Sequence, residues 1–513
     1  MAELSGPAAA EAQAERPFPP GEYPVVVVGS GPGGLQFSYA LRRLGIDHAL
    51  ISEDLAAGGM FRRWPFFQRL LSWTKPFAPA ERSSRAYERY DWNSLIADDP
   101  AHRALQVGFM DGSSEFPARP EMERNLVTFA ERTGIRVRFG CRWESTRRVE
   151  DRDGERFVLT TSDGEYTARV AVFAVGVAEP WRPPTPGIEL VAHYADTRPA
   201  ETYADRRIFI IGKQNSGFEI ASGLLQWASR IILASPSPAK LSVNTKSLVG
   251  VRARYVQPVE DHNLGGGVSI LDASVDSIER AGKAFRVRVR RSDNGAGLEF
   301  EVDEVIAATG FVTPLRDLPD LGIATFGQSK LPAQTPWWES ANVPGIYFAG
   351  TIGQGSAGLK KHGIPANSGA VHGARYNARL LAERIATHDF GAVVPRDPIG
   401  NGDVLPFCLD ELQRSPELWH QRAYLASVIT VTPEDGIRQA GIVPLATFLD
   451  DGGPDGIALT IEADGTGSIY PAVYVRNDGR IAEHLLPPHP LLDFRTSEHR
   501  DQLSAILGTL GLR

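Results

Sequence analysis

The chain has 513 residues, of which 42% are hydrophobic and 23% are charged, and its formal net charge is −8. That length predicts two to four domains rather than one core. The acidic balance and the absence of any run of Lys or Arg provide no field that would hold a phosphate backbone. Nucleic acid is therefore not expected as a partner.

Targeting and redox signals are also absent from the sequence. No stretch approaches the roughly 20 apolar residues of a membrane span, and residues 1–21 read as a disordered tail rather than a secretory signal. We therefore expect a cytoplasmic protein without a membrane partner. The two cysteines, Cys141 and Cys408, form no C-x-x-C pair, so neither a disulfide framework, a metal site nor a redox-active dithiol is expected.

A predicted strand over residues 23–28 enters the turn G-S-G-P-G-G and continues into an amphipathic helix. In this strand-turn-helix context, Gly29 permits the tight turn and Gly31 lets the backbone approach a pyrophosphate. Gly34 lets the helix pack closely on the strand. The helix N-terminus then offers free N–H groups to the phosphates. The pattern predicts a dinucleotide site.

The next predicted strand, residues 48–52, ends at an acid, Glu53, which follows Gly29 by 24 positions. At about this spacing a carboxylate can bind the hydroxyls of an adenosine ribose. The alternative is an exposed glutamate beside an ordinary glycine turn. Strand, glycines and acid together favour the ribose ligand.

A second unit of the same kind begins with an apolar strand over residues 207–211, which enters the turn G-K-Q-N-S-G before another helix. It predicts a second dinucleotide site. Gln214 stands where the second glycine normally lets the backbone approach a pyrophosphate, so an altered approach is expected. The predicted cofactor-binding residues of this turn are Gly212, Asn215, Ser216, Gly217 and Glu219.

Two further apolar strands end on glycine, at Thr309-Gly310 and at Gly350-Thr351. With these, with Y-D-W-N-S-L at 90–95 and with V-H-G-A-R-Y at 371–376, the sequence resembles the flavin-containing monooxygenase group. This group comprises the class B flavoproteins. The resemblance covers about residues 22–392. Within the group the chain looks most like the FAD-dependent oxidoreductase-domain proteins.

The resemblance implies an α/β fold in which a Rossmann-like nicotinamide domain is inserted into a Rossmann-like FAD domain, followed by a small C-terminal α+β domain. C-terminal strands are expected near residues 457–462, 468–475 and 480–486, with a final helix over 501–510. This region could cover the active site, form a homodimer interface or stabilise the fold. The expected domains are 22–177 (FAD, first part), 178–304 (NAD(P)H), 305–392 (FAD, second part) and 393–513 (C-terminal).

The same resemblance implies how the chain meets the flavin. Gly350 and Thr351 would deliver the chain beneath it, and a helix starting about Asn367 would point its positive end at the pyrimidine ring. Alternatively, Asn367 and Ser368 are simple N-caps of a surface helix. The other FAD contacts expected are Met60, Trp143, Thr309, Gly310, Ser368 and Gly369.

Without a cysteine pair, disulfide reduction has no electron acceptor in this chain. The resemblance implies an FAD- and NAD(P)H-dependent monooxygenase that reacts with molecular oxygen through a C4a-(hydro)peroxyflavin. Its small-molecule substrate would be a soft nucleophile, with an amine nitrogen favoured over sulfur. One alternative is a flavin oxidase or dehydrogenase reduced by its own substrate. The other is an FAD-containing, redox-responsive binding protein.

The aromatic and apolar segment from Gly58 to Trp73 suits the dry wall that such a site needs, with ordinary core packing as the alternative. Trp73 or Thr74 stands where the family often carries an Asn near the flavin edge. Lys75 could donate to the flavin or neutralise a substrate carboxylate. Asn93 is the fourth candidate catalytic residue, with a turn-forming Asn as its alternative.

The coenzyme choice stays open at this level, between NADPH and NADH. After the strand over 230–234 the chain lacks the Arg that commonly clamps a 2′-phosphate, and Ser237, Lys240 and Lys246 are the remaining candidates. The resemblance to the flavin-containing monooxygenase group favours NADPH. His193 is interpreted as a hinge or packing residue ahead of a catalytic one.

Overall fold

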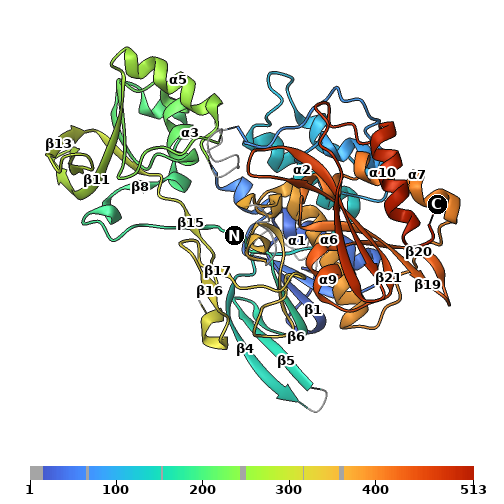
Figure 1. Ribbon diagram of the computed structural model, residues 1–513. Helices are drawn as coiled ribbons and strands as arrows, with labels where there is room; N and C mark the ends of the chain where they lie inside the picture. Colours follow the sequence, from blue (N-terminus) through green and yellow to red (C-terminus); the bar gives the residue numbers. More distant parts are fainter. Residues whose placement is uncertain are drawn as a thin grey trace.

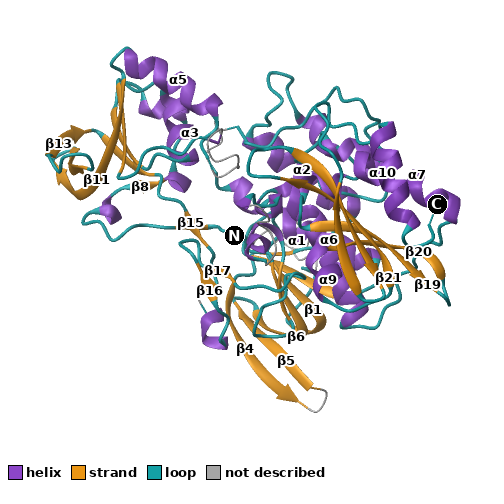
Figure 2. Cartoon of the chain, in the orientation of Figure 1, coloured by secondary structure: helices purple, strands orange, loops and turns teal. Residues whose placement is uncertain are grey.

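The computed structural model describes residues 16–64, 69–151, 154–242, 250–315, 317–356 and 363–512 (Figure 1). Most of the predicted tail, residues 65–68 of the predicted dry wall, and Lys246 lie outside these ranges. Figure 2 shows strands and helices interleaved throughout, as expected of an α/β protein. Among the described helices, none combines the length and apolar character required to cross a bilayer.

The first sheet forms around β1 (Gly21–Val28), whose valines are all buried. Val25 and Val27 pack into one core with helices α1, α2 and α6, while Val26 and Val28 pack into a second core on the opposite face. This two-sided burial is typical of a parallel strand inside an α/β sheet. The helices are α1 (Pro32–Arg43), α2 (Arg119–Thr133) and α6 (Val371–His388).

In the described residues this sheet has seven strands, in the order β3-β2-β1-β6-β5-β4, with β18 also paired to β6. Strands β3, β2, β1, β6 and β18 run parallel, and β5 and β4 extend the sheet as an antiparallel hairpin. The remaining bounds are β2 (His48–Ser52), β3 (Arg138–Phe139), β4 (Trp143–Asp151), β5 (Gly154–Thr161), β6 (Gly164–Phe173) and β18 (Ile346–Phe348).

The second sheet has the order β13-β12-β11-β10-β9-β14-β8 and carries α3 (Asn215–Leu224) and α5 (Ala253–Leu264). The predicted boundary after residue 304 is wrong. It would cut off β14 (Glu304–Ala307), which pairs in parallel with β9 and β8 inside this sheet. The other domain boundaries stay predictions. The remaining bounds are β8 (Ala192–His193), β9 (Arg207–Ile211), β10 (Arg230–Ser235), β11 (Val268–Ala281), β12 (Ala284–Arg291) and β13 (Gly297–Val302).

The two sheets are joined by a pair of short strands, β7 (Glu179–Pro180) and β15 (Phe311–Val312), which lie antiparallel. One carries the chain out to the second sheet and the other brings it back, as Figure 1 shows at the label β15. Beside this crossing, β16 (Thr325–Phe326) pairs with β17 (Leu331–Pro332). The insertion of the second sheet into the first fold, implied by the family resemblance, is confirmed.

The C-terminal region forms an antiparallel sheet in the order β20-β19-β21-β22-β23. The predicted strands and final helix are confirmed to within a few residues, as β21 (Asp455–Ala463), β22 (Ile469–Asn477), β23 (Arg480–Leu485) and α10 (Ser497–Gly508). The sequence analysis missed β19 (Leu425–Thr432), β20 (Gly436–Pro444), α7 (Val404–Arg414), α8 (Pro416–His420) and α9 (Leu445–Asp450).

Buried charge fastens this C-terminal region to the FAD part. Arg85 pairs with Glu411 of α7 at 2.6 Å and with Glu417 of α8 at 2.8 Å. The guanidinium of Arg89 lies 3.8 Å from the ring of Trp419. Glu411 and Glu417 are buried, so removal of Arg85 would leave two buried carboxylates without a partner. These contacts therefore hold the C-terminal sheet on the rest of the molecule.

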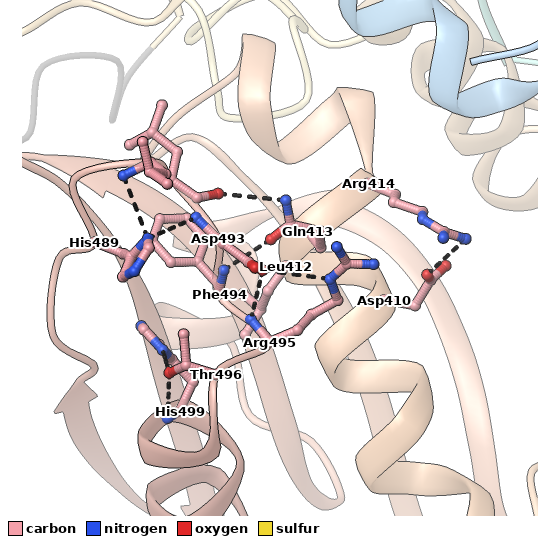
Figure 3. Close-up of polar contacts among 12 residues, drawn as sticks. Asp410, Leu412, Gln413, Arg414, His489, Asp493, Phe494, Arg495, Thr496 and His499 are labelled. Carbon is pink, nitrogen blue, oxygen red and sulfur yellow. Dashed lines mark hydrogen bonds and ion pairs between the residues drawn. The ribbon is translucent and has the colours of Figure 1, made fainter. Parts of the chain in front are cut away.

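Figure 3 shows how the segment before α10 is held against α7. The Gln413 side chain accepts from the Phe494 backbone N–H at 2.8 Å and donates to the Leu492 carbonyl at 3.3 Å. Thr496 then caps α10 by accepting from the backbone N–H of His499. No group of three or more His, Cys, Asp or Glu side chains in the described ranges is arranged to hold a metal ion. His489 accepts from the backbone N–H groups of Leu491 and Asp493, so this histidine holds the loop before α10.

Candidate functional site

A cavity of about 1920 Å³ lies where the first sheet, the second sheet and the C-terminal region meet. Ordinary small-molecule pockets measure roughly 300–1,000 Å³, so this one has room for more than a single small ligand. Its wall includes the first glycine turn, Asn215 and Ser216 of the second turn, and Leu445 and Leu449 of α9. The C-terminal region thus contributes directly to the site.

The first turn owes its shape to glycines in close contact with backbone. Gly29 has φ of +109°, and a Cβ there would lie 2.6 Å from the Ala174 carbonyl oxygen. A Cβ on Gly34 would lie 1.9 Å from the Gly29 carbonyl oxygen, and one on Gly33 would lie 2.4 Å from the Cα of Gly350. Gly34 therefore packs the helix on the strand, as predicted, and is not in the cavity lining.

Gly31 differs from its neighbours because its surroundings are open. Its φ is −74°, and the nearest atom to an added Cβ would be the Cα of Gly59, at 3.9 Å. Helix α1 begins beside it with Pro32, without a side-chain cap on the N-cap Gly31 and without an acid in its first turn. The free N–H groups and positive end of α1 thus face the cavity, which suits a diphosphate.

Glu53 lies in the cavity wall at the carboxyl end of β2, as the ribose prediction requires. Its carboxylate is held by Arg63 at 2.6 Å, and Arg63 also pairs with Asp54 at 2.8 Å. Met60 lines the cavity as well. Trp143 does too, packing on Phe173 with ring centroids 4.8 Å apart. These residues would surround the adenosine end of FAD.

The return strand brings Gly350, Thr351 and Gly369 to the cavity wall. The helix predicted to start about residues 367–369 is present as α6, with its first turn a few residues later. Residues Asn367–Gly369 form a short 3₁₀ turn, the extended backbone of Ala370 interrupts it, and α6 begins at Val371. Ser368 is fully buried and does not line the cavity, because its hydroxyl accepts from Gln421 and Asn377, both at 2.9 Å.

The second turn repeats the backbone of the first. Gly212 has φ of +124°, and a Cβ there would lie 2.4 Å from the Ala308 carbonyl oxygen. A Cβ on Gly217 would lie 2.3 Å from the Gly212 carbonyl oxygen. These two glycines set the backbone of the turn on the side away from the cavity. Asn215 and Ser216 line the cavity itself.

Glu219 also lines the cavity, although its carboxylate already has partners within the second sheet. It accepts from the hydroxyl of Tyr194 at 3.1 Å and from that of Tyr255 at 2.9 Å. Burial raises the pKa of Glu219 to about 7, against the opposing effect of these two hydrogen bonds. At neutral pH this carboxyl group is therefore partly protonated.

Thr309 and Gly310 lie at the crossing between the sheets rather than in the cavity wall. The Thr309 hydroxyl donates to the Trp181 carbonyl at 2.5 Å, and the Gly310 carbonyl accepts from the Trp181 N–H at 2.9 Å. His193 is fully buried, with Nε2 3.1 Å from the Gly310 carbonyl and Nδ1 accepting from the Ala195 N–H. His193 thus occupies the hinge position that we predicted for it.

None of the four candidate catalytic residues is part of the cavity wall. Thr74 donates to Asp91 at 2.8 Å and accepts from Asn93 at 3.0 Å, and both Thr74 and Asn93 are fully buried. Lys75 is exposed, and the ring of Trp73 packs on the ring of Trp92, with centroids 4.6 Å apart. Their catalytic assignment gains no support from this placement.

Ser72 and Trp92 take the cavity-facing positions instead, together with His372 in the first turn of α6. The Trp92 and His372 rings stack with centroids 4.2 Å apart. The sequence analysis used Trp92 and His372 only as parts of the motifs Y-D-W-N-S-L and V-H-G-A-R-Y, which mark the resemblance. Arg375 joins these two motifs, since it donates to the Ser94 carbonyl at 2.6 Å and to the Glu88 carbonyl at 2.9 Å.

Polar atoms without partners gather around this cavity, which is the local evidence that polar cofactors fit it. Within the described residues, several buried side-chain atoms of its wall have no hydrogen-bond partner. They belong to Trp64, Arg119, Asn215, Arg252, His372 and Arg375. A buried unsatisfied group costs about 1–3 kcal/mol. Bound FAD and nicotinamide dinucleotide would supply phosphate, ribose and ring partners at this wall.

Two glycine turns on two Rossmann-like sheets, opening into one cavity, define a flavoprotein with two dinucleotide-binding domains. The model of the pyridine nucleotide-disulphide oxidoreductase family matches residues 26–350. The chain belongs to this family. Membership implies FAD and a nicotinamide cofactor, which the residues above can hold. The two cysteines are free and buried, in separate cores.

Known proteins agree with this assignment. FAD-dependent oxidoreductase domain-containing protein 2 of Danio rerio is 26% identical over 69% of this chain, and the match spans 57% of that protein, less than two thirds of its length. Probable indole-3-pyruvate monooxygenase YUCCA4 of Arabidopsis thaliana is 24% identical over 68% of this chain and 89% of its own length. The resemblance to flavin-containing monooxygenase-like flavoproteins is confirmed.

A flavin-containing monooxygenase from Stenotrophomonas maltophilia has a similar fold, with a TM-score of 0.53 and 21% identity. The match covers 72% of this chain and 99% of that structure. The predicted fold of two dinucleotide-binding domains is confirmed. More than a quarter of this chain lies outside that common fold.

Proposed function

We propose that the protein is an FAD- and NAD(P)H-dependent monooxygenase that oxygenates a soft nucleophile on a small molecule, with an amine nitrogen favoured over sulfur. The overall reaction consumes the substrate, O₂, NAD(P)H and a proton, and yields the oxygenated product, water and NAD(P)⁺. The observation that carries the proposal is that Gly31 of the first turn and Ser216 of the second line the same cavity. Both dinucleotides could therefore reach one reaction space.

The residues have separable duties in this proposal. Gly31 and the N-terminus of α1 would bind the FAD diphosphate, and Glu53 its ribose. Asn215 and Ser216, at the N-terminus of α3, would bind the nicotinamide dinucleotide. When bound, FAD accepts a hydride from the nicotinamide and passes the electrons on to oxygen. The oxygen-transfer route stays a prediction.

Apolar and aromatic side chains line part of this space. The cavity wall includes Phe61, Trp64, Leu70 and Leu71 from the predicted dry segment. Excluding water strengthens the polar contacts inside and suppresses wasteful release of reduced oxygen. This wall favours a monooxygenase over an oxidase.

NADPH is the proposed coenzyme. The acid that follows β2 in the first unit has no counterpart in the second, where Pro236 follows β10 and the exposed Ser237 and Lys240 come next. An acid at this place binds a ribose 2′-hydroxyl and repels a 2′-phosphate. Its absence favours a phosphorylated coenzyme. Cytoplasmic location and a homodimer stay predictions from the sequence.

The test is anaerobic mixing of the FAD-loaded protein with NADPH or NADH, followed by air. Bleaching of the flavin band by NADPH, with oxygen uptake that yields little hydrogen peroxide once an amine is present, is the expected result. Bleaching only by an organic substrate would identify an oxidase or dehydrogenase. A flavin that no reductant bleaches would identify a binding protein. Either outcome refutes the proposal.

A further inference from the structure

The C-terminal region adds a helix to the cavity wall. Four residues of α9 line the cavity, namely Leu445, Ala446, Leu449 and Asp450, and we call them the α9 wall. The family model ends at residue 350, and α9 packs on the C-terminal sheet, which carries neither glycine turn. The α9 wall therefore lies outside the two dinucleotide-binding units.

One face of α9 packs on that sheet and the other faces the cavity. Leu445 and Phe448 are buried in a core cluster with apolar side chains of β19, β21 and β22. Ala446 and Leu449 are only half-buried. Apolar surface at a cavity wall gains free energy when a ligand removes it from water. This half-buried pair is thus the part of α9 that a ligand can cover.

Hydrogen bonds fix the place of α9 in the cavity. The Leu445 N–H donates to the Tyr424 carbonyl at 2.7 Å. The Tyr424 hydroxyl lies 2.9 Å from the hydroxyl oxygen of Ser356, which also lines the cavity. Gln421, three residues before Tyr424, donates to the carbonyl of Gly373 in the first turn of α6 at 3.2 Å. α9 is therefore tied to the end of the cavity where α6 begins, which is the end that we expect to hold the flavin ring.

The charge of the α9 wall restricts what it can bind. Three of its four residues are aliphatic, the fourth, Asp450, is an exposed acid, and none is basic. An anionic ligand body would meet repulsion from Asp450 and no compensating cation on this helix. An alkyl chain without negative charge avoids that cost, and it removes the surface of Ala446 and Leu449 from water.

We propose that the α9 wall selects the substrate, by binding the alkyl body of a neutral or cationic nucleophile along Ala446 and Leu449. The nucleophilic atom of that substrate then lies toward the first turn of α6 and the flavin. This inference rests on the proposed function and names the substrate class of that site, amines or sulfides that carry an alkyl chain. The C-terminal region, whose role the sequence left open, acts here as a determinant of specificity.

The experiment measures how binding depends on the length of the alkyl chain. The probes are butylamine, hexylamine and octylamine, and the butyl, hexyl and octyl methyl sulfides. Each is titrated into the FAD-loaded full chain, read by perturbation of the flavin absorption and by calorimetry. In at least one series the affinity should rise about two- to fourfold for each added methylene, because burial of a methylene is favourable by about that factor. An affinity that does not change with chain length in either series overturns the inference.

Two substitutions change the α9 wall in opposite directions. Leu449→Ala removes apolar surface, so the octyl probe should bind about three- to tenfold more weakly. Ala446→Phe fills the space along the wall, so the octyl probe should lose more than about tenfold in affinity and the butyl probe less than about twofold. A general fault in the fold of α9 would weaken all chain lengths alike. Equal losses for the butyl and octyl probes in both variants therefore overturn the inference.

Thr447→Phe is the matched control. Thr447 lies on the same helix, next to Ala446, and is not part of the cavity lining. This variant adds the same ring to α9 and should keep the chain-length dependence of the wild-type protein. If it removes that dependence as completely as Ala446→Phe does, the effect does not come from the cavity face of α9 and the inference is overturned.

Cofactor measurements separate the α9 wall from the cofactor sites. FAD content and anaerobic bleaching by NADPH are recorded for every variant, and both should match the wild-type protein. If Ala446→Phe lowers either one and leaves the chain-length dependence unchanged, the wall belongs to a cofactor site and the inference is overturned. Normal bleaching without chain-length dependence contradicts the inference alone. A wild-type protein that shows the dependence, but whose flavin NADPH does not bleach, contradicts the proposed function alone.

Discussion

The first and second glycine turns share one backbone and differ in what they present to the cavity. Gly29 and Gly212 both have positive φ, and Gly34 and Gly217 both press against the carbonyl oxygen of the glycine five residues earlier. These contacts are set by strand-to-helix geometry, which is the same in both units. Positions that shape a turn are therefore repeated.

The positions that meet a ligand are not repeated. Gly31 of the first turn corresponds to Gln214 of the second, and Glu53 after β2 corresponds to Pro236 after β10. The middle glycine and the acid suit a close diphosphate and a free ribose. The glutamine and proline suit a different dinucleotide, bound less closely. This difference is what two sites with separate ligands on a common scaffold would show.

Gly34→Val should have the largest effect. The added side chain would lie against the Gly29 carbonyl oxygen, within 1.9 Å at its Cβ, so helix α1 cannot stay on β1. We expect a loss of about 3 kcal/mol or more of folding free energy, and little folded protein. Thermal melting and soluble yield measure it. Gly217→Val should behave alike, and a normally stable Gly34→Val variant would contradict the packing role.

Gly31→Leu should preserve the fold and remove FAD. The backbone at Gly31 accepts a side chain, and the nearest atom to its Cβ is 3.9 Å away, but the side chain would occupy the space of the diphosphate. We expect FAD affinity to fall more than about 100-fold, or roughly 2.7 kcal/mol. The ratio of flavin to protein absorbance measures it. Gln214→Leu is the control and should stay yellow. A fully yellow Gly31→Leu variant would count against the first site.

Pro236→Asp should transfer the acid of the first unit to the second, because Pro236 follows β10 as Glu53 follows β2. The new carboxylate would repel a 2′-phosphate and bind a 2′-hydroxyl, so the preference for NADPH over NADH should fall about tenfold in kcat/KM of flavin reduction. Stopped-flow bleaching with each coenzyme measures it, and FAD content should not change. An unaltered preference would show that this end of β10 does not meet the coenzyme.

Glu219→Gln should have an effect that appears only as a pH dependence of stability. Since burial raises the pKa of Glu219 from 4.5 to about 7, the folded state binds more protons than the unfolded state between these values. The stability contributed by this group is present below about pH 4.5 and is lost as pH rises through 7. Relative to wild type, the variant should gain about 2.5 kcal/mol between pH 5 and pH 8. Melting curves at both pH values test this, and a constant difference would contradict it.

Local pattern was enough to locate both turns, their strands and helices, and the acid at Glu53. Each depends on residues within about 25 positions, where strand, glycine and helix constrain one another directly. The insertion of the nicotinamide domain into the FAD domain was predicted from the family resemblance and not from local pattern. The boundary near residue 304 failed because an apolar strand such as β14 fits either sheet, and only its pairing with β9 decides.

The tertiary structure alone decided which side chains share the cavity. Thr74 and Asn93 carry the polar groups that sequence reasoning favoured, yet their mutual hydrogen bond turns them away from it. Trp92 and His372 are 280 positions apart and meet through ring stacking. In an irregular segment, the order of polar and apolar residues does not reveal which side chains are buried. Burial depends on the elements that pack against the segment. The sequence by itself determined where dinucleotides can bind, and long-range packing determined what stands beside them.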